Sequence, residues 1–511
     1  MALKVLVDWD NNFNYTGTYD DITADVTAIS WKLGFRAPYQ DVADESTCKI
    51  TLANTDGKYN PENSSSPLHD LLLPQRRTEI RWVPAGGGTT VLWAGFIEFP
   101  SVTWETAGAA TGNTFAQLNG IGFKSILDKV KVNLPVYTGV TGDVILTDVL
   151  SQAIIPANCP GIWILGMASF SELGDTTILM DVANFATIET GTVLVSTGSD
   201  PQITTASQMI ADVTMAERGR FFIDRSGECT WWNRHHLLTN VADSGTVVCS
   251  TGDFRPTQIE YTYGELLSNV IEVTIAPPNT DTAETLWELP NEITIPISSS
   301  SVLFATLRRD TGQYVGASTL VASPTFSQGT ATVTVIEYGN QAEITLTNAS
   351  STLNAILTSL TLSGAPTVQQ NQMTVHKEDT ATLTVYGERQ FSVRLGALST
   401  YADAEFVADY ELFNRKAPIG MIKSVKYARA LEDASSTALL GWPIGTRLAV
   451  SAAEIGHSAD YFVMGEEHSW TPGANGGYHE MTLRLEQARL AMWVLGDAGY
   501  SELSDTTTVG Y

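Results

Sequence analysis

Residues 49–53 read Lys-Ile-Thr-Leu-Ala, and a turn of sequence Asn-Thr-Asp-Gly follows at 54–57. The alternation places two apolar side chains on one face, which is typical of a half-buried β-strand. The glycine that ends the turn supplies the positive φ that tight turns need. Residues 79–83 and 91–96 form a similar pair on either side of three consecutive glycines. Short strands joined by such turns predict a small antiparallel β-barrel in this part of the chain.

The same stretch resembles the opening domain of phage tail hub proteins, which are also called minor tail proteins of siphophages. In that family a strand ends in an Asn-x-Asp-Gly-x-Tyr-x-Pro turn, a Ser/Pro loop follows, and a later strand ends near Trp-x-Gly-x-Ile. The matching positions here are Asn54, Asp56, Gly57, Tyr59, Pro61, Pro67, Trp93 and Gly95. Two further matches are "AERGRFFIDRSGECTWWNR" at 216–234, whose hairpin turns at Gly227, and "YTYGELLSNVIEVTI" at 261–275. The resemblance as a whole covers about 20–130, 140–275 and 376–490.

This resemblance implies a mainly β chain with some α structure (α+β) and several domains. Two of the domains would be antiparallel β-barrels of the tail-tube type, accompanied by an α+β domain and a small β domain. The function it implies is that of a structural virion protein and not an enzyme. The chain would be the hub of a tail tip or baseplate, related to the baseplate hubs of contractile tails. It would form a pseudo-sixfold ring that closes the tail tube and helps to conduct DNA at ejection.

The partners that the resemblance implies are mostly other tail proteins. They are further copies of the chain in a homotrimer, a distal tail protein or the tail tube, a tape-measure protein, and a distal fibre or receptor-binding protein. DNA is expected only as passing cargo, and neither a cofactor nor direct membrane insertion is expected. The protein would be located in the virion, at the phage tail tip, after assembly in the host cytoplasm.

Strand and helix patterns divide the chain into five segments. They are a first β-barrel domain at 1–125, an α+β domain with a helix and hairpin at 126–265, a β-rich domain at 266–375, a second β-barrel domain at 376–490 and a docking segment at 491–511. Apolar periodicity and capping residues predict helices at 141–155, 207–219 and 401–416. In the second barrel a glycine late in a strand, Gly465, and the following Trp470 repeat the order of Gly95 and Trp104.

A seventeen-residue segment occurs twice. Residues 163–179 read WILGMASFSELGDTTIL and residues 493–509 read WVLGDAGYSELSDTTTV, with ten identical positions. Such repetition indicates a duplicated architecture. We expect the two copies to make equivalent contacts with a sixfold partner or around the ring, because buried aromatic and apolar side chains dominate interface energetics. The residues proposed to make these contacts are Trp163, Leu165, Glu172, Leu173, Trp493, Leu495, Glu502 and Leu503.

Composition excludes several function classes. The formal net charge of −27 argues against a protein that grips nucleic acid phosphates. The carboxylates either line a channel that repels DNA or form an acidic, soluble outer surface, and the sequence leaves both interpretations open. Four cysteines (Cys48, Cys159, Cys229 and Cys249) lack the spacing of a zinc site, which indicates reduced, buried thiols.

Motifs that carry catalysis or metal binding are also missing from the sequence. The acidic start of the chain, from Asp8 to Asn12, lacks the remaining ligands of a calcium loop and predicts an Asx turn. His235 and His236 are adjacent and would face opposite ways on a strand, as would Trp231 and Trp232. Two alternative functions remain: a receptor- or carbohydrate-binding tail adhesin that uses the segment 285–370, and a distal tail protein hexamer, against which the duplication argues.

Overall fold

A computed structural model describes most of the chain and shows three hydrophobic cores. The described residues are 2–12, 14–84, 87–105, 113–132, 134–152, 154–156, 177–179, 186–197, 204–240, 242–369, 371–431, 433–489, 491–492 and 507–508. Strands make up most of the regular structure, so the chain is mainly β and multidomain. None of the described helices has the length and apolar character needed to cross a bilayer.

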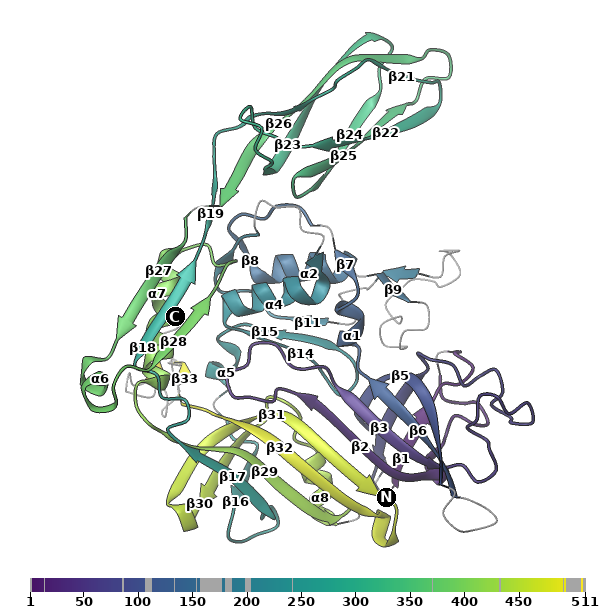
Figure 1. The fold of residues 1–511 in the computed structure, drawn as a ribbon, viewed down its shortest axis with the longest axis vertical. Helices are drawn as coiled ribbons and strands as arrows, with labels where there is room; N and C mark the ends of the chain where they lie inside the picture. Colours follow the sequence, from purple (N-terminus) through teal and green to yellow (C-terminus); the bar gives the residue numbers. More distant parts are fainter. Residues whose placement is uncertain are drawn as a thin grey trace.

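The largest element is a twelve-stranded sheet at the base of the molecule in Figure 1. Its order is β1-β4-β5-β6-β3-β2-β31-β32-β29-β17, with β30 beside β31 and β16 beside β30. The strands are β1 (Ala2–Val7), β2 (Val26–Gly34), β3 (Thr47–Ala53), β4 (Arg77–Val83), β5 (Thr90–Glu105), β6 (Asn113–Ile121), β16 (Gly245–Val248), β17 (Gln258–Tyr263), β29 (Gly420–Ala430), β30 (Arg447–Ala452), β31 (His457–Thr471) and β32 (Tyr478–Gln487).

This sheet consists of two halves with the same strand order. The first half is β1-β4-β5-β6-β3-β2, and the second is β16-β30-β31-β32-β29-β17. Within each half the strands also follow one another along the chain in the same sequence. Pairing is antiparallel throughout, except that β16 lies parallel to β30 whereas β1 lies antiparallel to β4. The chain therefore contains one six-stranded unit twice, with a long insertion between β17 and β29.

The two predicted barrels correspond to curved halves of this sheet, and the described strand pairs do not close either half on itself. The first half comes near closure, because the backbone N–H of Ile22 donates to the carbonyl of Val5 and the N–H of Val7 donates to Asp20. Most of the buried side chains of both halves belong to one continuous hydrophobic core. The segment 376–490 is divided between two sheets, since the part before β29 packs elsewhere.

A second layer packs on the sheet and contains the helices α2 and α4 (Figure 1). Its elements are α1 (Lys124–Leu127), β7 (Lys131–Val132), β8 (Val140–Thr141), α2 (Gly142–Gln152), β9 (Ile154–Pro156), β10 (Thr177–Leu179), β11 (Ala186–Ile188), β12 (Leu194–Val195), β13 (Thr204–Thr205), α4 (Ala206–Glu217), β14 (Arg220–Ile223), β15 (Cys229–Trp232) and α5 (His236–Thr239). The second core lies largely in this layer.

The insertion between β17 and β29 has two parts. The first is a three-stranded sheet that packs against a helix and shares the second core. It comprises β18 (Val270–Ile275), β27 (Met373–Glu378), α6 (Thr380–Tyr386), β28 (Gln390–Arg394) and α7 (Tyr401–Arg415). The second part is a β-sandwich with its own core, which extends away from the sheet at the top of Figure 1. Its strands are β19 (Pro278–Thr280), β20 (Glu284–Glu288), β21 (Ile293–Ile295), β22 (Ser299–Thr306), β23 (Gly316–Gln328), β24 (Thr332–Tyr338), β25 (Gln341–Asn348) and β26 (Ala355–Gln369).

The helices lie close to where the sequence predicts them, with two differences. Thr205 caps α4 by accepting from the N–H of Gln208, and the left-handed residue at the other end is Arg218. The next residue, Gly219, is needed for a different reason: a Cβ there would collide with the carbonyl of Trp232. The helix α7 differs at Phe406, which apolar periodicity places on the buried face but which is 51% exposed. Its buried face consists mainly of smaller residues: Ala404, Val407, Ala408, Glu411 and Asn414.

Candidate assembly interface

The two halves of the sheet are joined by one strand pair, β2 with β31, which we call the seam. The register runs antiparallel from Ile29 opposite Trp470 to Gly34 opposite Gly465. The N–H of Phe35 continues the ladder by donating to the carbonyl of Met464 over 2.8 Å. Edge-to-edge pairing of this kind uses the backbone groups that an isolated edge strand would leave exposed.

Two glycines allow the strands to meet at one end of the seam. Gly34 has a φ of +88°, and a Cβ on it would lie 2.5 Å from the carbonyl oxygen of Met464 and 2.8 Å from the Cα of Gly465. A Cβ on Gly465 would collide with the carbonyl of Phe35. Both positions therefore require glycine because backbone approaches backbone.

Beneath the seam lies a buried polar chain that begins at Trp31. Its indole stacks on the imidazole of His468, with ring centroids 4.5 Å apart and an interplanar angle of 5°. His468 Nε2 lies 3.0 Å from Glu466, and its Nδ1 lies 3.1 Å from Nε2 of His479. We assign the protons from this network: His468 donates to the carboxylate, and His479 donates to His468.

Arg225 completes this chain from another part of the fold. It projects from the turn between β14 and β15 and donates to both carboxylate oxygens of Glu466, with Nε at 3.0 and 3.1 Å and Nη2 at 2.7 Å. It also donates to the carbonyls of Leu440 and Trp442. This bidentate pair ties the second layer to the seam.

Burial and neighbouring charges set the pKa values of Glu466, His468 and His479. Desolvation alone would raise the pKa of Glu466, but the charge of Arg225 and the hydrogen bond from His468 outweigh it and lower that pKa. Desolvation lowers the pKa of His468, and it lowers the pKa of His479 to about 3. Both histidines are therefore neutral at physiological pH, and Glu466 is ionised.

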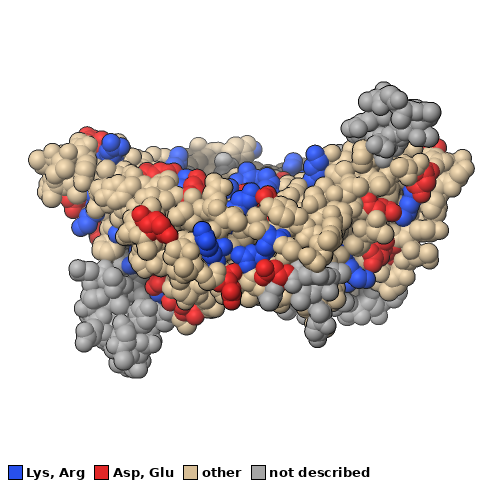
Figure 2. All heavy atoms as spheres, turned by 90° about the horizontal axis from the view of Figure 1, so that it is seen from below, with Lys and Arg blue, Asp and Glu red and all other residues tan. Residues whose placement is uncertain are grey.

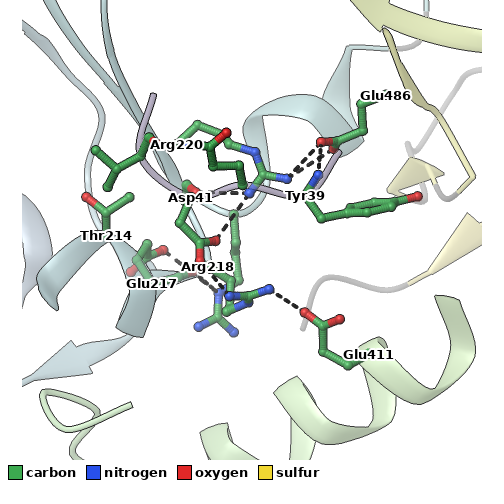
Figure 3. Close-up of polar contacts among 12 residues, drawn as sticks. Tyr39, Asp41, Thr214, Glu217, Arg218, Arg220, Glu411 and Glu486 are labelled. Carbon is green, nitrogen blue, oxygen red and sulfur yellow. Dashed lines mark hydrogen bonds and ion pairs between the residues drawn. The ribbon is translucent and has the colours of Figure 1, made fainter. Parts of the chain in front are cut away.

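A second buried network, drawn in Figure 3, surrounds the turn between α4 and β14. Arg218 binds Asp41 at 2.8 Å and also pairs with Glu411 of α7. Arg220 binds Glu486 of β32 at 3.0 Å. Four segments that are distant in the sequence thus meet through alternating charges, which fixes how the second layer and the insertion sit on the sheet.

Further contacts surround this network. Arg415 donates to Glu411, so the carboxylate lies between two guanidinium groups, which outweigh the effect of burial and lower its pKa. Glu486 also accepts from the N–H of Tyr39 at 2.6 Å. The space left among these side chains is about 40 Å³, which suits a water molecule and not a substrate. The network is a structural junction.

The turn residues singled out in the sequence lie at two kinds of position. Asn54 is buried, accepts from the N–H of Tyr59 at 2.9 Å and starts a turn in which Gly57 has a φ of +71°. Asp56 accepts from the N–H of Lys58. Gly227 ends the turn after Arg225 with a φ of +95°.

The remaining two glycines, Gly95 and Gly465, lie inside β5 and β31 and not at turns. They do not occupy equivalent positions either. Gly95 pairs with Thr78 of the preceding strand, whereas Gly465 lies beyond the end of the corresponding β30 pairing. Trp104 and Trp470, by contrast, are equivalent. Phe96 pairs with Arg77 as Phe462 pairs with Arg447, and each tryptophan lies eight residues beyond its phenylalanine.

The repeat residues proposed for docking all lie outside the described residues. Only the ends of the two copies are described. Thr177 pairs antiparallel with Pro156, whereas its counterpart Thr507 pairs parallel with Ala491, in the strand pair of β33 (Ala491–Met492) and β34 (Thr507–Thr508). The described end of the first copy thus lies in an antiparallel strand pair, and that of the second copy lies in a parallel one.

The aromatic and histidine pairs have structural roles. Trp231 belongs to the second core and donates to Thr214 at 3.1 Å, while Trp232 belongs to the first core and stacks on His236. His236 also contacts Glu189 at 2.6 Å. Among the described residues no group of histidine, cysteine and acidic side chains is arranged to hold a metal ion. The acidic start of the chain forms Asx-type turns: Asp8 accepts from the N–H of Asn12, and Asn12 Oδ1 accepts from the N–H of Asn14 at 3.2 Å.

Sequence reasoning missed a second internal repeat, and one of its copies is the first strand of the seam. Residues 27–34 read TAISWKLG and residues 257–264 read TQIEYTYG. Both segments form the same strand of their half, β2 and β17. The signal was present as a shared Thr-x-Ile-x-aromatic-x-x-Gly pattern, but it becomes visible only when the strand orders are aligned.

Comparisons with known proteins found no matching family model and no matching curated sequence. Among solved structures, the tail protein from Neisseria meningitidis MC58 is similar with a TM-score of 0.47 and 11% identity, over 99% of this chain and 100% of that one. The 43 kDa tail protein of prophage MuSo2 from Shewanella oneidensis has a TM-score of 0.46 and 9% identity, over 95% and 98%. Prophage tail protein gp18 from Listeria monocytogenes EGD-e has a TM-score of 0.38 and 8% identity, over 95% and 94%.

Proposed function

We propose that this chain is a structural protein of a phage tail, the hub of a tail tip or baseplate. The observation that carries the proposal is the repeated six-stranded unit, whose two copies share one strand order and pair edge to edge within a single chain. Three chains would then supply six such units. A trimer of this kind would match a sixfold tail tube with a pseudo-sixfold ring.

The sequence motifs support the same proposal at the level of single residues. The Asn-x-Asp-Gly-x-Tyr turn resembles that of tail hubs, and its Tyr59 is buried and donates to Asp25 at 2.6 Å. The hairpin that resembles the same family supplies Arg225, which anchors the seam. Both segments that resemble the family thus contribute a buried polar contact to the sheet, through Tyr59 in one and Arg225 in the other.

Charge favours DNA as passing cargo and not as a bound ligand. The net charge of −27 opposes tight contact with phosphates. Figure 2 shows that the face viewed from below is mixed, with basic side chains gathered near the middle and acidic ones around them. We propose no catalytic activity, and we propose a distal tail protein or tail tube, a tape-measure protein and a fibre as neighbours in the virion.

Two measurements test this proposal. Light scattering on the purified chain, alone and with its neighbouring tail proteins, should give the mass of a trimer; a hexamer would favour a distal tail protein. Phage particles produced without the chain should lack a finished tail tip, and a labelled chain should appear at the tip in electron micrographs. Normal, infectious particles without the chain would refute the function.

One observation favours a second role in receptor binding. On the outer face of the sandwich sheet formed by β22, β25 and β24, Phe304 is 71% exposed and Ile336 is 46% exposed. Both residues pair with Glu343, so they lie in one row across the sheet. Replacing Phe304 with serine should reduce adsorption to host cells if this face binds a receptor, and should leave assembly unchanged.

A further inference from the structure

Each strand of the seam has a counterpart in the other half of the sheet, β17 for β2 and β5 for β31. We infer that β17 of one copy pairs with the free edge of β5, residues 98–104, in the next copy, and so repeats the pairing of β2 with β31. The inference rests on the proposed ring and specifies its interface. The occupant of each edge is a second copy of this chain.

In the second half of the sheet β17 occupies the position that β2 has in the first half. Thr27 Oγ1 donates to the carbonyl of Thr51, and Thr257 Oγ1 donates to the carbonyl of Lys426 in the corresponding strand. Both strands run seven residues from this threonine to a glycine with positive φ, Gly34 at +88° and Gly264 at +71°. The two strands therefore align residue by residue.

In the first half of the sheet β5 occupies the position that β31 has in the second half. Arg77 pairs with Phe96 as Arg447 pairs with Phe462. One residue further, Ile97 donates to the carbonyl of Arg76 and accepts from Gln75, just as Val463 donates to Thr446 and accepts from Gly445.

The two strands also deviate from regular pairing at the same place. Each carries a bulge directly after this residue, between Ile97 and Phe99 in β5 and between Val463 and Gly465 in β31. Beyond the bulge, β31 pairs with β2, whereas β5 pairs only with β6 among the described strands. The segment that corresponds to the seam is thus unpaired on one side.

Both edges are accessible. Tyr263 of β17 is 69% exposed and Tyr261 is 36% exposed, and Val102 of β5 is 39% exposed. The described backbone bonds at the ends of β17, those of Thr257 and Gly264, go to β29 and its approach. The strand β17 ends one half of the sheet and β5 belongs to the other half (Figure 1), so copies would add head to tail. Such a contact generates a ring if the rotation closes.

The alignment fixes the register between copies. Within the chain Ile29 lies opposite Trp470 and Trp31 lies opposite His468. In the proposed contact between copies, the corresponding pairs are Ile259 with Trp104 and Tyr261 with Val102. Tyr263 then lies opposite Pro100, and proline is found in sheets where its nitrogen faces an open edge. Pro100 removes one bond from this ladder and still accepts one from the N–H of Tyr263. The interface pairs exposed aromatic side chains with apolar ones, as cross-strand packing favours.

A disulfide scan tests the register directly. Ser30 and Ser469 form a pair between two hydrogen-bonded positions, where antiparallel Cα atoms approach to about 4.5 Å, within disulfide range. The double variant Ser30→Cys/Ser469→Cys is the intramolecular reference and should oxidise within one chain. The corresponding Glu260→Cys/Thr103→Cys should oxidise between chains and give covalent dimers and closed rings on non-reducing gels, with the 260–103 disulfide identified by mass spectrometry.

The matched control is Glu260→Cys/Val102→Cys, whose second cysteine faces the other side of the sheet and should give at least tenfold less of the cross-linked product. Equal cross-linking of both pairs, or no 260–103 disulfide in either the isolated chain or assembled particles, would overturn the inference. If the chain is in the tail tip but the disulfide does not form, this interface fails and the hub function stands. If the disulfide forms but the chain is absent from particles, the hub function fails and the interface stands.

A non-covalent measurement checks the same surface. Tyr263→Lys puts a charge on the last strand of the sheet, at a residue whose side chain is 69% exposed, and should weaken self-association at least tenfold in sedimentation experiments. Tyr386→Lys, on an exposed tyrosine of α6, is the control and should have no effect. Unchanged association of the Tyr263 variant would contradict the proposed edge contact.

Discussion

The pair of Arg225 and Glu466 gives the most demanding test of how the seam is held. Replacing Arg225 with methionine keeps much of the volume of the side chain and removes its charge and donors. Glu466 is 1% exposed and would lose three hydrogen bonds, and the carbonyls of Leu440 and Trp442 would each lose one. His468 would remain as its partner beneath the seam.

The expected cost follows from the burial of the pair. Removing one partner of a buried ion pair costs about 3–5 kcal/mol, because the other charge is left without compensation. At about 1.4 kcal/mol per decade, this is a fall of roughly two to three and a half decades in a local equilibrium constant. Replacing both residues with methionine should cost less than Arg225→Met alone, because no isolated charge then remains in the interior.

The assay is native-state hydrogen exchange of peptides from β31 and β32, read by mass spectrometry. It reports the opening free energy of the seam itself and does not require the whole multidomain chain to unfold as one unit. Protection in these strands should fall in the single variant and recover partly in the double variant. Strictly additive losses, or a change below about 1 kcal/mol in the single variant, would refute the view that Arg225 neutralises a buried carboxylate.

Three further predictions concern pH, packing and thiol chemistry. Burial lowers the pKa of His479 to about 3, so below pH 6.5 the unfolded chain binds a proton that the folded chain does not. The free energy of unfolding should therefore fall with acid between about pH 6.5 and 3, by up to about 1.4 kcal/mol per pH unit. In urea titrations His479→Gln should flatten this slope. Gly465→Ala should destabilise the seam and lower the melting temperature by several degrees, whereas Gly396→Ala, with open space around its Cβ, should not. In the native protein a thiol reagent should modify Cys249, which is partly exposed, and spare Cys48, because burial raises the pKa of that thiol. Rapid labelling of Cys48 would show that the first half of the sheet opens.

Local features of the fold follow from local sequence. The turn at Asn54 and Gly57 is specified by an Asx side chain and a glycine, and α7 is specified by the cap at Thr400, which accepts from the N–H of Asp403. These interactions span a few residues, so their signals are contiguous. The same holds for the hairpin turn at Gly227.

The candidate interface was much less accessible to sequence reasoning. Pairing of β2 with β31 joins residues more than four hundred positions apart. Neither strand has a sequence pattern that identifies the strand with which it pairs. Arg225 sits in a recognisable turn, but its partner Glu466 lies in a different element and is buried only after the halves meet. The long repeat at 163–179 and 493–509 indicated duplication. The shorter Thr-x-Ile pattern at Thr27 and Thr257 identifies the duplicated strand, which is β2 in one half and β17 in the other.

The insertion between β17 and β29 also bears on how this chain was assembled in evolution. Gly264 donates to the carbonyl of Ile419 at 2.8 Å, so the insertion leaves and rejoins the sheet at adjacent points, where the first half has only the connection from β2 to β3. Within it, Ile275 lies opposite Met373, and the sandwich departs and returns between those two strands. Each later addition therefore occupies the tip of an existing hairpin, one nested in another. The sandwich can therefore be removed or replaced between Ile275 and Met373 without changing the order of the strands beneath it.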